Sequence, residues 1–441
     1  MVKRAMITLA LLVALMAGVI VPPAGVGAAA RVRRRTIAPG VVYKRMIFRR
    51  PAQRVHVVSI KPGARSTLDT VLAANSLPGF ERTSSMAKRS RALVAINADY
   101  ARPSGRPVHL FARDGSLLQT ALVYGRNFAI NRTETQTYFG HPKPRIYASE
   151  IDDLIEHRID RINNRHPGYR QLALYSPESK GVASVPEDAC SARMYPTGPT
   201  SLSSDGVPGR QYEVGTVFCR RRRMARMDGT ILSAQMNGSR AGEFAVPGFA
   251  RGDRVTVGWT LGWPNVTDTV GGNPILVREG KIVWSDVQGR HPFFARNPRT
   301  GIGVTKSGKV LLVVVDGRRR KAKGMTLARF ARLFRDLGAT WALNLDGGGS
   351  STMVIRGEVK NRPSDGRERG VSSALVLLAG PDPGEGETQA PVPMTTADGG
   401  GEAALADPAS TGGLVSVAVE GGAAASPLVR RLARRFDTRR R

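Results

Sequence analysis

The sequence predicts a mixed α/β fold in which helices pack on a largely buried sheet, and three observations support it. First, Val310–Val315 is an unbroken apolar run, rich in β-branched residues, that ends at Asp316, as in a strand buried on both faces. Second, Leu327 to Leu337 places its apolar residues on one helical face. Third, a further apolar run follows from Thr340 to Leu345. Strand, helix and strand over this length indicate a crossover that joins parallel strands.

Two acids follow the strands of this crossover. Thr326 is placed to cap the helix and Gly338 to end it, and the second strand stops at Asp346 as the first stops at Asp316. Carboxyl ends of parallel strands meet at one edge, where open α/β sheets bind their ligands. The backbone of Gly347 to Gly349 can approach a polar ligand there. The alternative is that Asp-Gly only forms the turns that end two strands.

Other elements follow from similar patterns along the chain. We expect a hairpin from Val41 to Ile60, helices at 68–77, 84–91 and 149–165, strands at 92–96, 254–260 and 373–379, and a hairpin at 275–283. The helix at 149–165 is predicted because Ser149 and Asp152 form a variant capping box before isoleucines and leucines at helical spacing. It lies in an insertion, about 140–226, which we interpret as a lid or a side module, with an ornamental surface insertion as the alternative.

The ends of the chain differ from the rest in composition. Met1 to Ala30 has a charged start, an apolar stretch and a small-residue end, which predicts a secretory signal peptide, with an uncleaved anchor as the alternative. Residues 381–441 are rich in Pro, Gly and Ala and end in a basic segment, so we expect a disordered tail. In an exported chain, the only two cysteines, Cys190 and Cys219, predict a disulfide.

The formal net charge of +31 points to an anionic partner. For an exported protein, a phosphate-bearing glycan or anionic cell-wall polymer fits better than nucleic acid, and we expect no stable membrane insertion once the signal is removed. An alternative is that arginine is simply spread along the whole chain by composition. One basic cluster, Arg318 to Lys323, directly follows Asp316 and would lie over the proposed site.

The motifs NLDGGGSST (344–352), PRTGIGV (298–304) and NRPSDG (361–366) resemble those of the phosphodiester glycosidase domain family. The resemblance extends upstream through ALVAINADYARPSGRP (92–107), so it implies one domain over about 31–380. A strand-end Asn97 and a Gly-Gly turn at Gly272 also match the family pattern, whereas His109 stands where a smaller residue is expected. The implied function is a secreted glycosidase that hydrolyses a sugar 1-phosphodiester, of the N-acetylglucosamine type.

Cleavage at the anomeric carbon passes through an oxocarbenium-like transition state. A departing phosphate is a weak base, so a cation that neutralises it matters more than a proton donor. Asp316 and Asp346 are therefore the candidate catalytic carboxylates, and Arg299 and Arg318 the candidate phosphate clamp. The full set of candidate substrate-binding residues is Asn97, Gly272, Arg299, Thr300, Arg318, Gly347, Gly348, Gly349, Ser350, Ser351, Asn361 and Asp365.

Two questions stay open at this level. The sequence requires no cofactor, yet the oxygens of Asp316, Asp346, Asp365, Asn97 and Asn361 would suit Ca²⁺ or Mg²⁺. The domain could also be a non-catalytic module that binds or assembles cell-wall or exopolysaccharide chains.

Overall fold

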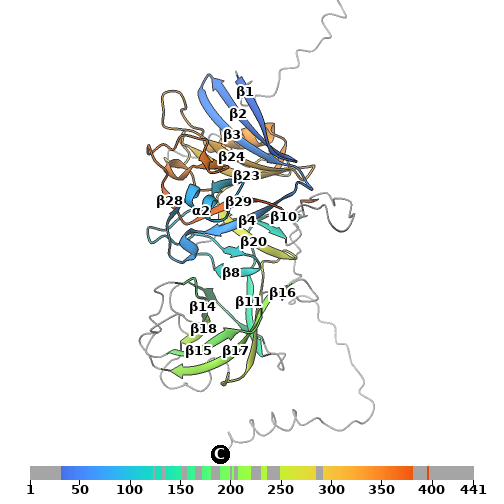
Figure 1. The fold of residues 1–441 in the computed structure, drawn as a ribbon, viewed down its shortest axis with the longest axis vertical. Coiled ribbons are helices and arrows are strands. Elements are labelled where there is room, and N and C mark those ends of the chain that lie inside the picture. The colour runs from blue at the N-terminus through green and yellow to red at the C-terminus, as the bar shows by residue number, and fades with distance from the viewer. Residues whose placement is uncertain are drawn as a thin grey trace, which may run out of the picture. The chain divides into compact units, whose positions relative to one another are not determined.

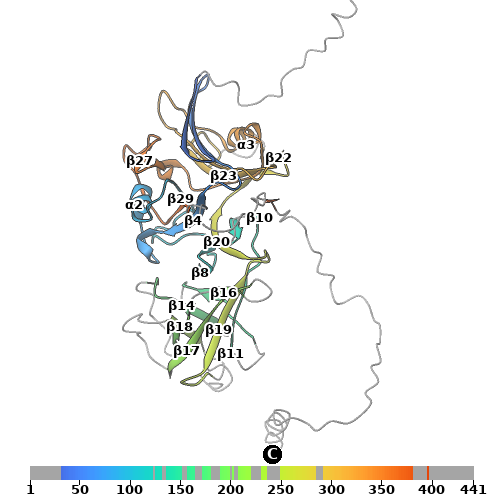
Figure 2. The ribbon, with the colours of Figure 1, turned by 45° about the vertical axis from the view of Figure 1, so that its right-hand side comes forward.

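The computed structural model shows a protein built mainly from antiparallel β-sheets, with two α-helices in the part of the chain that it describes (Figures 1 and 2). The described residues are 31–122, 125–131, 136–150, 156–163, 171–179, 189–198, 201–202, 207–219, 230–235, 249–284, 292–380 and 395–396. The predicted signal peptide lies outside these residues, as does almost all of the predicted tail. None of the described helices is long and apolar enough to cross a bilayer.

The predicted mixed α/β class is therefore wrong, because antiparallel strands dominate and the described parts of two predicted helices contain strands. Residues 145–150 form β11 (Arg145–Glu150), which pairs with β19 (Arg254–Thr260) along its whole length. Residues 66–72 form β4 (Ser66–Leu72), where Leu68, Thr70 and Leu72 alternate toward the core. In β4 the pairing with a distant strand, and the burial it brings, outweighs a helical spacing of apolar residues.

An eight-stranded sheet carries the central stretch of the chain. Its neighbouring strands all pair antiparallel. Its order is β1 (Arg31–Ala38), β2 (Val41–Arg49), β3 (Ala52–Ile60), β24 (Val310–Val315), β23 (Arg299–Thr305), β25 (Ala339–Asn344), β21 (Ile275–Arg278) and β22 (Lys281–Ile282). The two predicted hairpins, 41–60 and 275–283, are confirmed. β24 and β25 run in the same direction, as predicted, but β23 lies between them and is antiparallel to both.

Helix α3 (Leu327–Asp336) packs against this sheet because β23 is rich in glycine. A Cβ atom at Gly301 would lie 2.9 Å from the ring of Phe334 and 3.0 Å from that of Phe330. Both rings are fully buried. The predicted cap is confirmed, since the hydroxyl of Thr326 accepts a hydrogen bond from the Arg329 amide at 3.2 Å. β24 is buried on both faces, also as predicted, because its alternate residues enter two different core clusters.

Two further sheets complete the surroundings of the site. The five-stranded sheet has the order β27 (Glu358–Val359), β26 (Met353–Ile355), β6 (Val94–Asn97), β29 (Ser373–Ala379) and β4. The six-stranded sheet has the order β30 (Thr395–Thr396), β10 (Gln136–Gly140), β9 (Arg126–Asn131), β20 (Val266–Gly272), β7 (Phe111–Arg113) and β8 (Ser116–Gln119). Helix α2 (Thr83–Arg89) follows β5 (Glu81–Arg82), which pairs with β28 (Gly370–Val371).

The predicted insertion, about 140–226, supplies most of a nine-stranded sheet. The strand order of this sheet is β12 (His157–Arg158), β11, β19, β17 (Pro208–Cys219), β15 (Ala189–Pro196), β18 (Thr230–Gln235), β14 (Leu172–Tyr175) and β13 (Arg161–Ile162), with β16 (Ser201–Leu202) beside β17. β19 belongs to this sheet rather than to that of the central stretch. The insertion is thus a β-structure in its described residues, and whether it serves as a lid or as a side module stays a prediction.

The register of this sheet makes the predicted disulfide testable. Cys190 in β15 and Cys219 in β17 are directly paired residues on antiparallel strands. Directly opposed residues have Cα separations of about 4.5–5.5 Å, within the range that a disulfide spans. Intact mass should therefore rise by two protons on reduction, and reduction should lower the free energy of unfolding by about 3 kcal/mol. Two freely alkylated thiols in the untreated exported protein would contradict the bridge.

Candidate active site

Asp346 lies where β25 ends, and it is the half-buried acid around which the other polar groups of this region gather. Its backbone amide donates to the Ala98 carbonyl at 2.9 Å, so it is tied to the end of β6. Burial raises the pKa of the Asp346 carboxyl to about 6, while hydrogen bonds from the Ser350 side chain and the Gly347 amide lower it. The carboxylate is therefore mostly ionised at neutral pH but close to its titration range.

Asn97, at the end of β6, fixes the backbone on both sides of Asp346. Its side-chain amide donates to the Asp346 carbonyl at 2.7 Å. Its side-chain oxygen accepts from the Thr300 hydroxyl at 2.9 Å and from the Thr352 amide at 3.0 Å. Because Asn97 is fully buried, losing any of these bonds would leave polar groups unpaired. We therefore assign Asn97 the role of positioning the loop rather than of contacting substrate.

Tyr100 places a phenol group beside Asp346. The Tyr100 hydroxyl donates to the Asn273 carbonyl at 2.8 Å and accepts from the Asn344 side chain at 2.6 Å. Burial raises the pKa of Tyr100 well above its ordinary value, and the nearby Asp346 carboxylate adds to this rise. The phenol therefore stays protonated, and its position is set by residues at the ends of β25 and β20.

Asp99 and His109 form a buried pair behind Tyr100. The His109 ring nitrogen Nδ1 lies 2.5 Å from a carboxylate oxygen of Asp99, and the His109 amide donates to the other oxygen at 2.8 Å. The ring fits because a Cβ atom at Gly271 would lie only 2.0 Å from the His109 side chain. His109 is thus accommodated where a smaller residue was expected, and its ring meets Tyr100 edge to face at 6.0 Å.

The three glycines after Asp346 are flanked by two guanidinium groups. Gly348 has a φ of +63°, and a Cβ atom there would lie 3.2 Å from the Arg318 guanidinium. A Cβ atom at Gly349 would lie 2.2 Å from both the Arg369 guanidinium and the Asp365 carboxylate. Arg369 donates to Asp365 at 2.6 Å and 3.1 Å. Glycine is required because these side chains approach the backbone so closely.

Arg299 is placed differently from what a phosphate clamp requires. It is 3% exposed, and its Nε and Nη2 groups donate to the carbonyls of Met325, Phe293 and Ala295 at 2.7–2.9 Å. Burial lowers the pKa of Arg299 to about 10. These bonds anchor the segment before β23. Because they use Nε and Nη2, Arg299 could contact a phosphate only through Nη1. Arg318 is exposed and hydrogen-bonds to Asn297, which leaves it better placed for that role.

Asp316 is the predicted residue whose surroundings least resemble those of a catalytic acid. It is 2% exposed and accepts a hydrogen bond from the Arg362 amide at 2.8 Å. Its other oxygen lies 3.8 Å from Nε2 of His56, whose Nδ1 is 2.7 Å from the Tyr43 hydroxyl. The structure therefore shows Asp316 holding the loop after Asn361. It shares a sheet edge with Asp346, as predicted, but β23 separates the two strands.

The other predicted residues surround Asp346 in supporting positions. Asn361 accepts from the Met353 amide and donates to the Ser351 carbonyl, both at 2.8 Å. A Cβ atom at Gly272 would lie 2.5 Å from the Asn344 carbonyl, so this glycine permits close strand packing. Sequence reasoning missed Tyr100, Asn344 and Arg369. The first two stand at strand ends next to predicted residues, and that position was the signal available.

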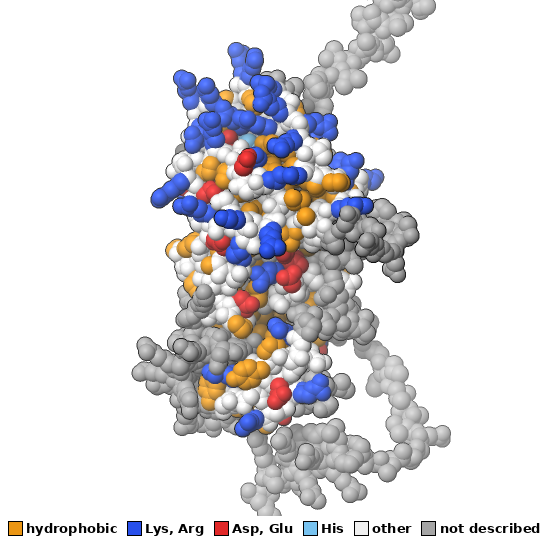
Figure 3. All heavy atoms as spheres, in the orientation of Figure 1, with side chains coloured by type: hydrophobic (Ala, Val, Ile, Leu, Met, Phe, Trp, Pro, Cys, Tyr) orange, Lys and Arg blue, Asp and Glu red, His pale blue; other side chains and the backbone are white. Residues whose placement is uncertain are grey.

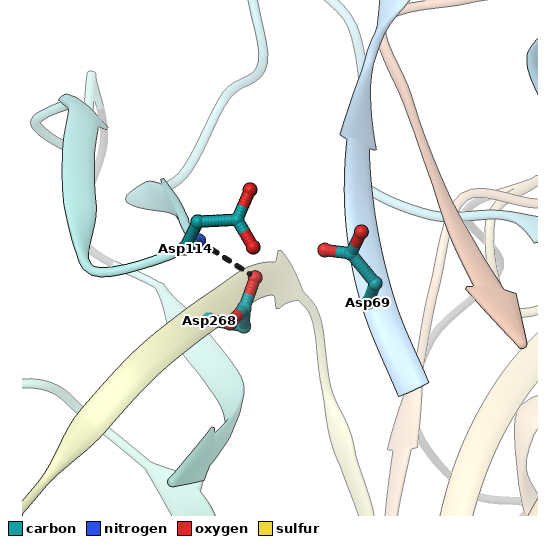
Figure 4. Close-up of side chains that lie close together, drawn as sticks. All are labelled: Asp69, Asp114 and Asp268. Carbon is teal, nitrogen blue, oxygen red and sulfur yellow. Dashed lines mark hydrogen bonds between the residues drawn. The ribbon is translucent and has the colours of Figure 1, made fainter. Parts of the chain in front are cut away.

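The described residues contain one group of three acids close enough to hold a metal ion, and it is not the predicted one. Asp69 in β4, Asp114 between β7 and β8, and Asp268 in β20 bring carboxylate oxygens within 4.8 Å of one another (Figure 4). The Asp268 carboxylate accepts from the Asp114 amide at 3.2 Å and from the Thr70 hydroxyl at 3.1 Å. The predicted acids Asp316, Asp346 and Asp365 do not form such a group.

This acidic cluster makes stability depend on pH. Burial, then the charges of Asp69 and Asp114, raise the pKa of Asp268 from the ordinary 3.8 to about 8. Because the folded state holds this proton more tightly than the unfolded chain, the stabilisation is present below about pH 4. It is lost as pH rises toward 8, by at most about 1.4 kcal/mol per pH unit. Between pH 5 and 8.5, the melting temperature of Asp268→Asn should therefore fall less with rising pH than that of the wild type.

The control for this prediction is Glu213→Gln, which removes an exposed carboxylate from β17. It should follow the wild-type pH dependence. A slope in Asp268→Asn equal to that of the wild type would contradict the assignment.

Comparison with known proteins shows a family similarity over the region that contains this site. Residues 211–378 match the family model described as NAGPA, phosphodiester glycosidase. This range contains Asp316, the strand β25 that leads to Asp346, and the triple glycine. The predicted resemblance to the phosphodiester glycosidase family is thus confirmed over that region.

Particular relatives match shorter segments. The SPbeta prophage-derived uncharacterized protein YomE of Bacillus subtilis is 36% identical over 108 residues, which cover 23% of this chain and 16% of that protein. N-acetylglucosamine-1-phosphodiester alpha-N-acetylglucosaminidase of Mus musculus is 37% identical over 67 residues, 15% of this chain and 13% of that protein. The chain thus matches about a sixth or less of the length of these curated relatives.

Solved structures share the fold over most of the chain. A hypothetical protein from Synechocystis superposes with a TM-score of 0.60 at 21% identity, covering 80% of this chain and 64% of that one. A putative exported protein from Burkholderia pseudomallei superposes with a TM-score of 0.57 at 18% identity, covering 81% and 98%. The arrangement of sheets described above therefore also occurs in these proteins from Synechocystis and Burkholderia pseudomallei.

Proposed function

We propose that the protein is a hydrolase that cleaves the bond between the anomeric carbon of a sugar and a phosphate in a phosphodiester. The observation that carries the proposal is the family match over residues 211–378, within which one ionisable acid, Asp346, adjoins a glycine loop flanked by two guanidinium groups. The enzyme from Mus musculus that matches part of this chain is named for this class of reaction. An N-acetylglucosamine-type sugar is therefore the first substrate to test.

In this proposal one set of residues acts on the sugar and another on the phosphate. The Asp346 carboxylate stabilises the positive charge that develops on the anomeric carbon. Arg318 and Arg369 neutralise the departing phosphate from either side of the triple glycine. Tyr100 and Asn97 hold Asp346 in place. Asp316 acts on the loop after Asn361 and is a positioning residue.

We further propose that the protein acts outside the cell on a phosphate-bearing glycan or anionic wall polymer, without nucleic acid as partner and without stable membrane insertion. The supporting features are the N-terminal sequence, Met1 to Ala30, and the excess of 66 Lys and Arg over 35 Asp and Glu. Localisation is tested by N-terminal sequencing of the protein recovered from the culture medium and the cell wall.

The deciding experiment measures release of free N-acetylglucosamine from its 1-phosphodiester by the purified protein, with and without a chelator. Release that survives chelation supports hydrolysis by the residues named above, and release that stops would assign a metal ion a role. Binding to cell-wall polymer with no release from a panel of sugar phosphodiesters would favour the alternative, a non-catalytic binding or assembly module.

A further inference from the structure

A second basic site lies apart from Asp346. A cavity of about 380 Å³ opens between the β1–β2 hairpin and the β26–β27 hairpin. Lys and Arg side chains gather on the surface over β1 and β2 (Figure 3). None of the residues placed above around Asp346 lines this cavity. It is therefore a feature that the proposed reaction does not use.

The cavity is lined by six cationic side chains and a single carboxylate, Glu358. Glu358 is already paired with Lys360. The Nη2 group of Arg356 donates a hydrogen bond to the Ile37 carbonyl at 2.5 Å. Within the described part of the chain, Nε of Arg45 is buried and has no hydrogen-bond partner. A buried guanidinium N–H without an acceptor is costly unless a ligand supplies one.

The strand register forces these cations together. Arg33 stands directly opposite Arg45, and Arg34 directly opposite Lys44, on the antiparallel strands β1 and β2. Like charges at directly opposed positions destabilise a sheet. Next to this pair, burial and then the charge of Arg34 lower the pKa of Lys44, which does not line the cavity. A general excess of arginine along the chain does not account for an opposed pair, Arg33 and Arg45, that lines the same cavity.

We propose that this cavity binds a phosphate group carried on a sugar or polyol, and so holds a second repeat of an anionic glycan while another repeat occupies the Asp346 site. This inference rests on the proposed function. Guanidinium groups bind phosphate through paired hydrogen bonds, and the volume lies in the range of small-ligand sites.

The lining favours a glycan over single-stranded nucleic acid. Nucleic-acid sites stack successive bases on aromatic side chains. The one aromatic ring in the lining, Tyr43, is already stacked on His56 at 6.1 Å, and its hydroxyl is engaged with the same residue. The remaining walls are guanidinium groups, Lys360, Glu358 and two isoleucine side chains, which suit a phosphate on a small saccharide or polyol.

The test compares binding of full-length protein to a purified poly(glycerol phosphate) chain by calorimetry in about 0.1 M salt. The double variant Arg33→Ala, Arg45→Ala should bind at least about tenfold more weakly, because two charge-assisted contacts are lost. The double variant Arg251→Ala, Arg254→Ala removes the same charge from exposed positions and should change the affinity less than about twofold. Without polymer, Arg33→Ala, Arg45→Ala should melt no lower than the wild type, since it removes an opposed like-charge pair.

Three results would overturn the proposal: equal weakening in both double variants, no binding of the polymer by the wild type, or tighter binding of a charge-matched oligo(dT) or of phosphatidylglycerol vesicles. Turnover of a small N-acetylglucosamine 1-phosphodiester by the wild type is measured separately. Polymer binding that depends on Arg33 and Arg45 without any turnover would defeat the proposed function and leave the second site standing. Turnover of the small substrate without polymer binding that depends on Arg33 and Arg45 would support the proposed function and defeat the second site.

Discussion

Asp346→Asn should fold with a near-normal melting temperature and lose two to three orders of magnitude in turnover of a sugar 1-phosphodiester. Asparagine fits the same turn and keeps one oxygen for the Ser350 and Gly347 hydrogen bonds that Asp346 receives. What it removes is the negative charge beside the anomeric carbon, and such a charge interaction contributes about 3 to 4 kcal/mol to the stability of a transition state. Initial rates at saturating substrate, with thermal melts of the same samples, measure both quantities.

The pH profile is the internal control for this result. Because the Asp346 pKa is raised to about 6, wild-type turnover should fall as pH drops through 6, when the carboxylate gains a proton. This acid limb should vanish from the residual activity of Asp346→Asn. Asp316→Asn should differ in kind, with a lowered melting temperature, since Asp316 is buried against the Arg362 amide and His56. Near-normal turnover in folded Asp346→Asn would remove Asp346 from the reaction.

Arg369→Ala should slow hydrolysis of an alkyl phosphodiester by roughly 10- to 100-fold, the range expected when one charged hydrogen-bond donor to the leaving group is lost. The effect should be much smaller on an aryl glycoside, because its leaving group carries less negative charge. Arg318→Ala should show the same dependence on the leaving group. The measurement is kcat/KM for both substrates with each variant.

The matched control is Arg367→Ala, which removes an exposed guanidinium from the same loop, two residues from Arg369. It should leave both substrates nearly unaffected. Arg299→Ala serves as a second comparison, because three backbone carbonyls lose their donor and the protein should lose stability. If Arg369→Ala slowed the two substrates equally, Arg369 would serve the folding of the loop through Asp365 or the binding of the sugar.

The central stretch could be predicted because its signals are local. The apolar run of β24, the cap at Thr326 and the helical face of α3 are each defined by neighbouring residues, and the structure confirms all three. The class was wrong because β4 and β11 take their conformation from partners far along the chain. No local pattern announces such pairing.

The same limit explains what was missed in the site. Asp346 was identified because the sequence places it at a strand end before glycines, and the structure keeps it beside Ser350. The burial of Asp316 depends on β3 and on the loop that begins at Asn361, and neither is visible in the sequence around it. Arg369 reaches Gly349 only because the loop folds back, so its role could not be predicted from spacing.

The five-stranded sheet has a consequence for the order in which the molecule assembles. β29 pairs with β4 and β6, and the Ser373 hydroxyl accepts a hydrogen bond from the Asp99 amide, 274 residues away in sequence. During synthesis, β6 and the residues Asn97 to Asp99 at its end are therefore made long before the partner that completes the sheet. Pairings between such distant segments form slowly, because closing the chain between them costs entropy before any contact is gained. A nascent chain that stops short of Ser373 already contains every residue of the Asp346 loop, but it still lacks β29, the strand that pairs with β6 and bonds to the Asp99 amide.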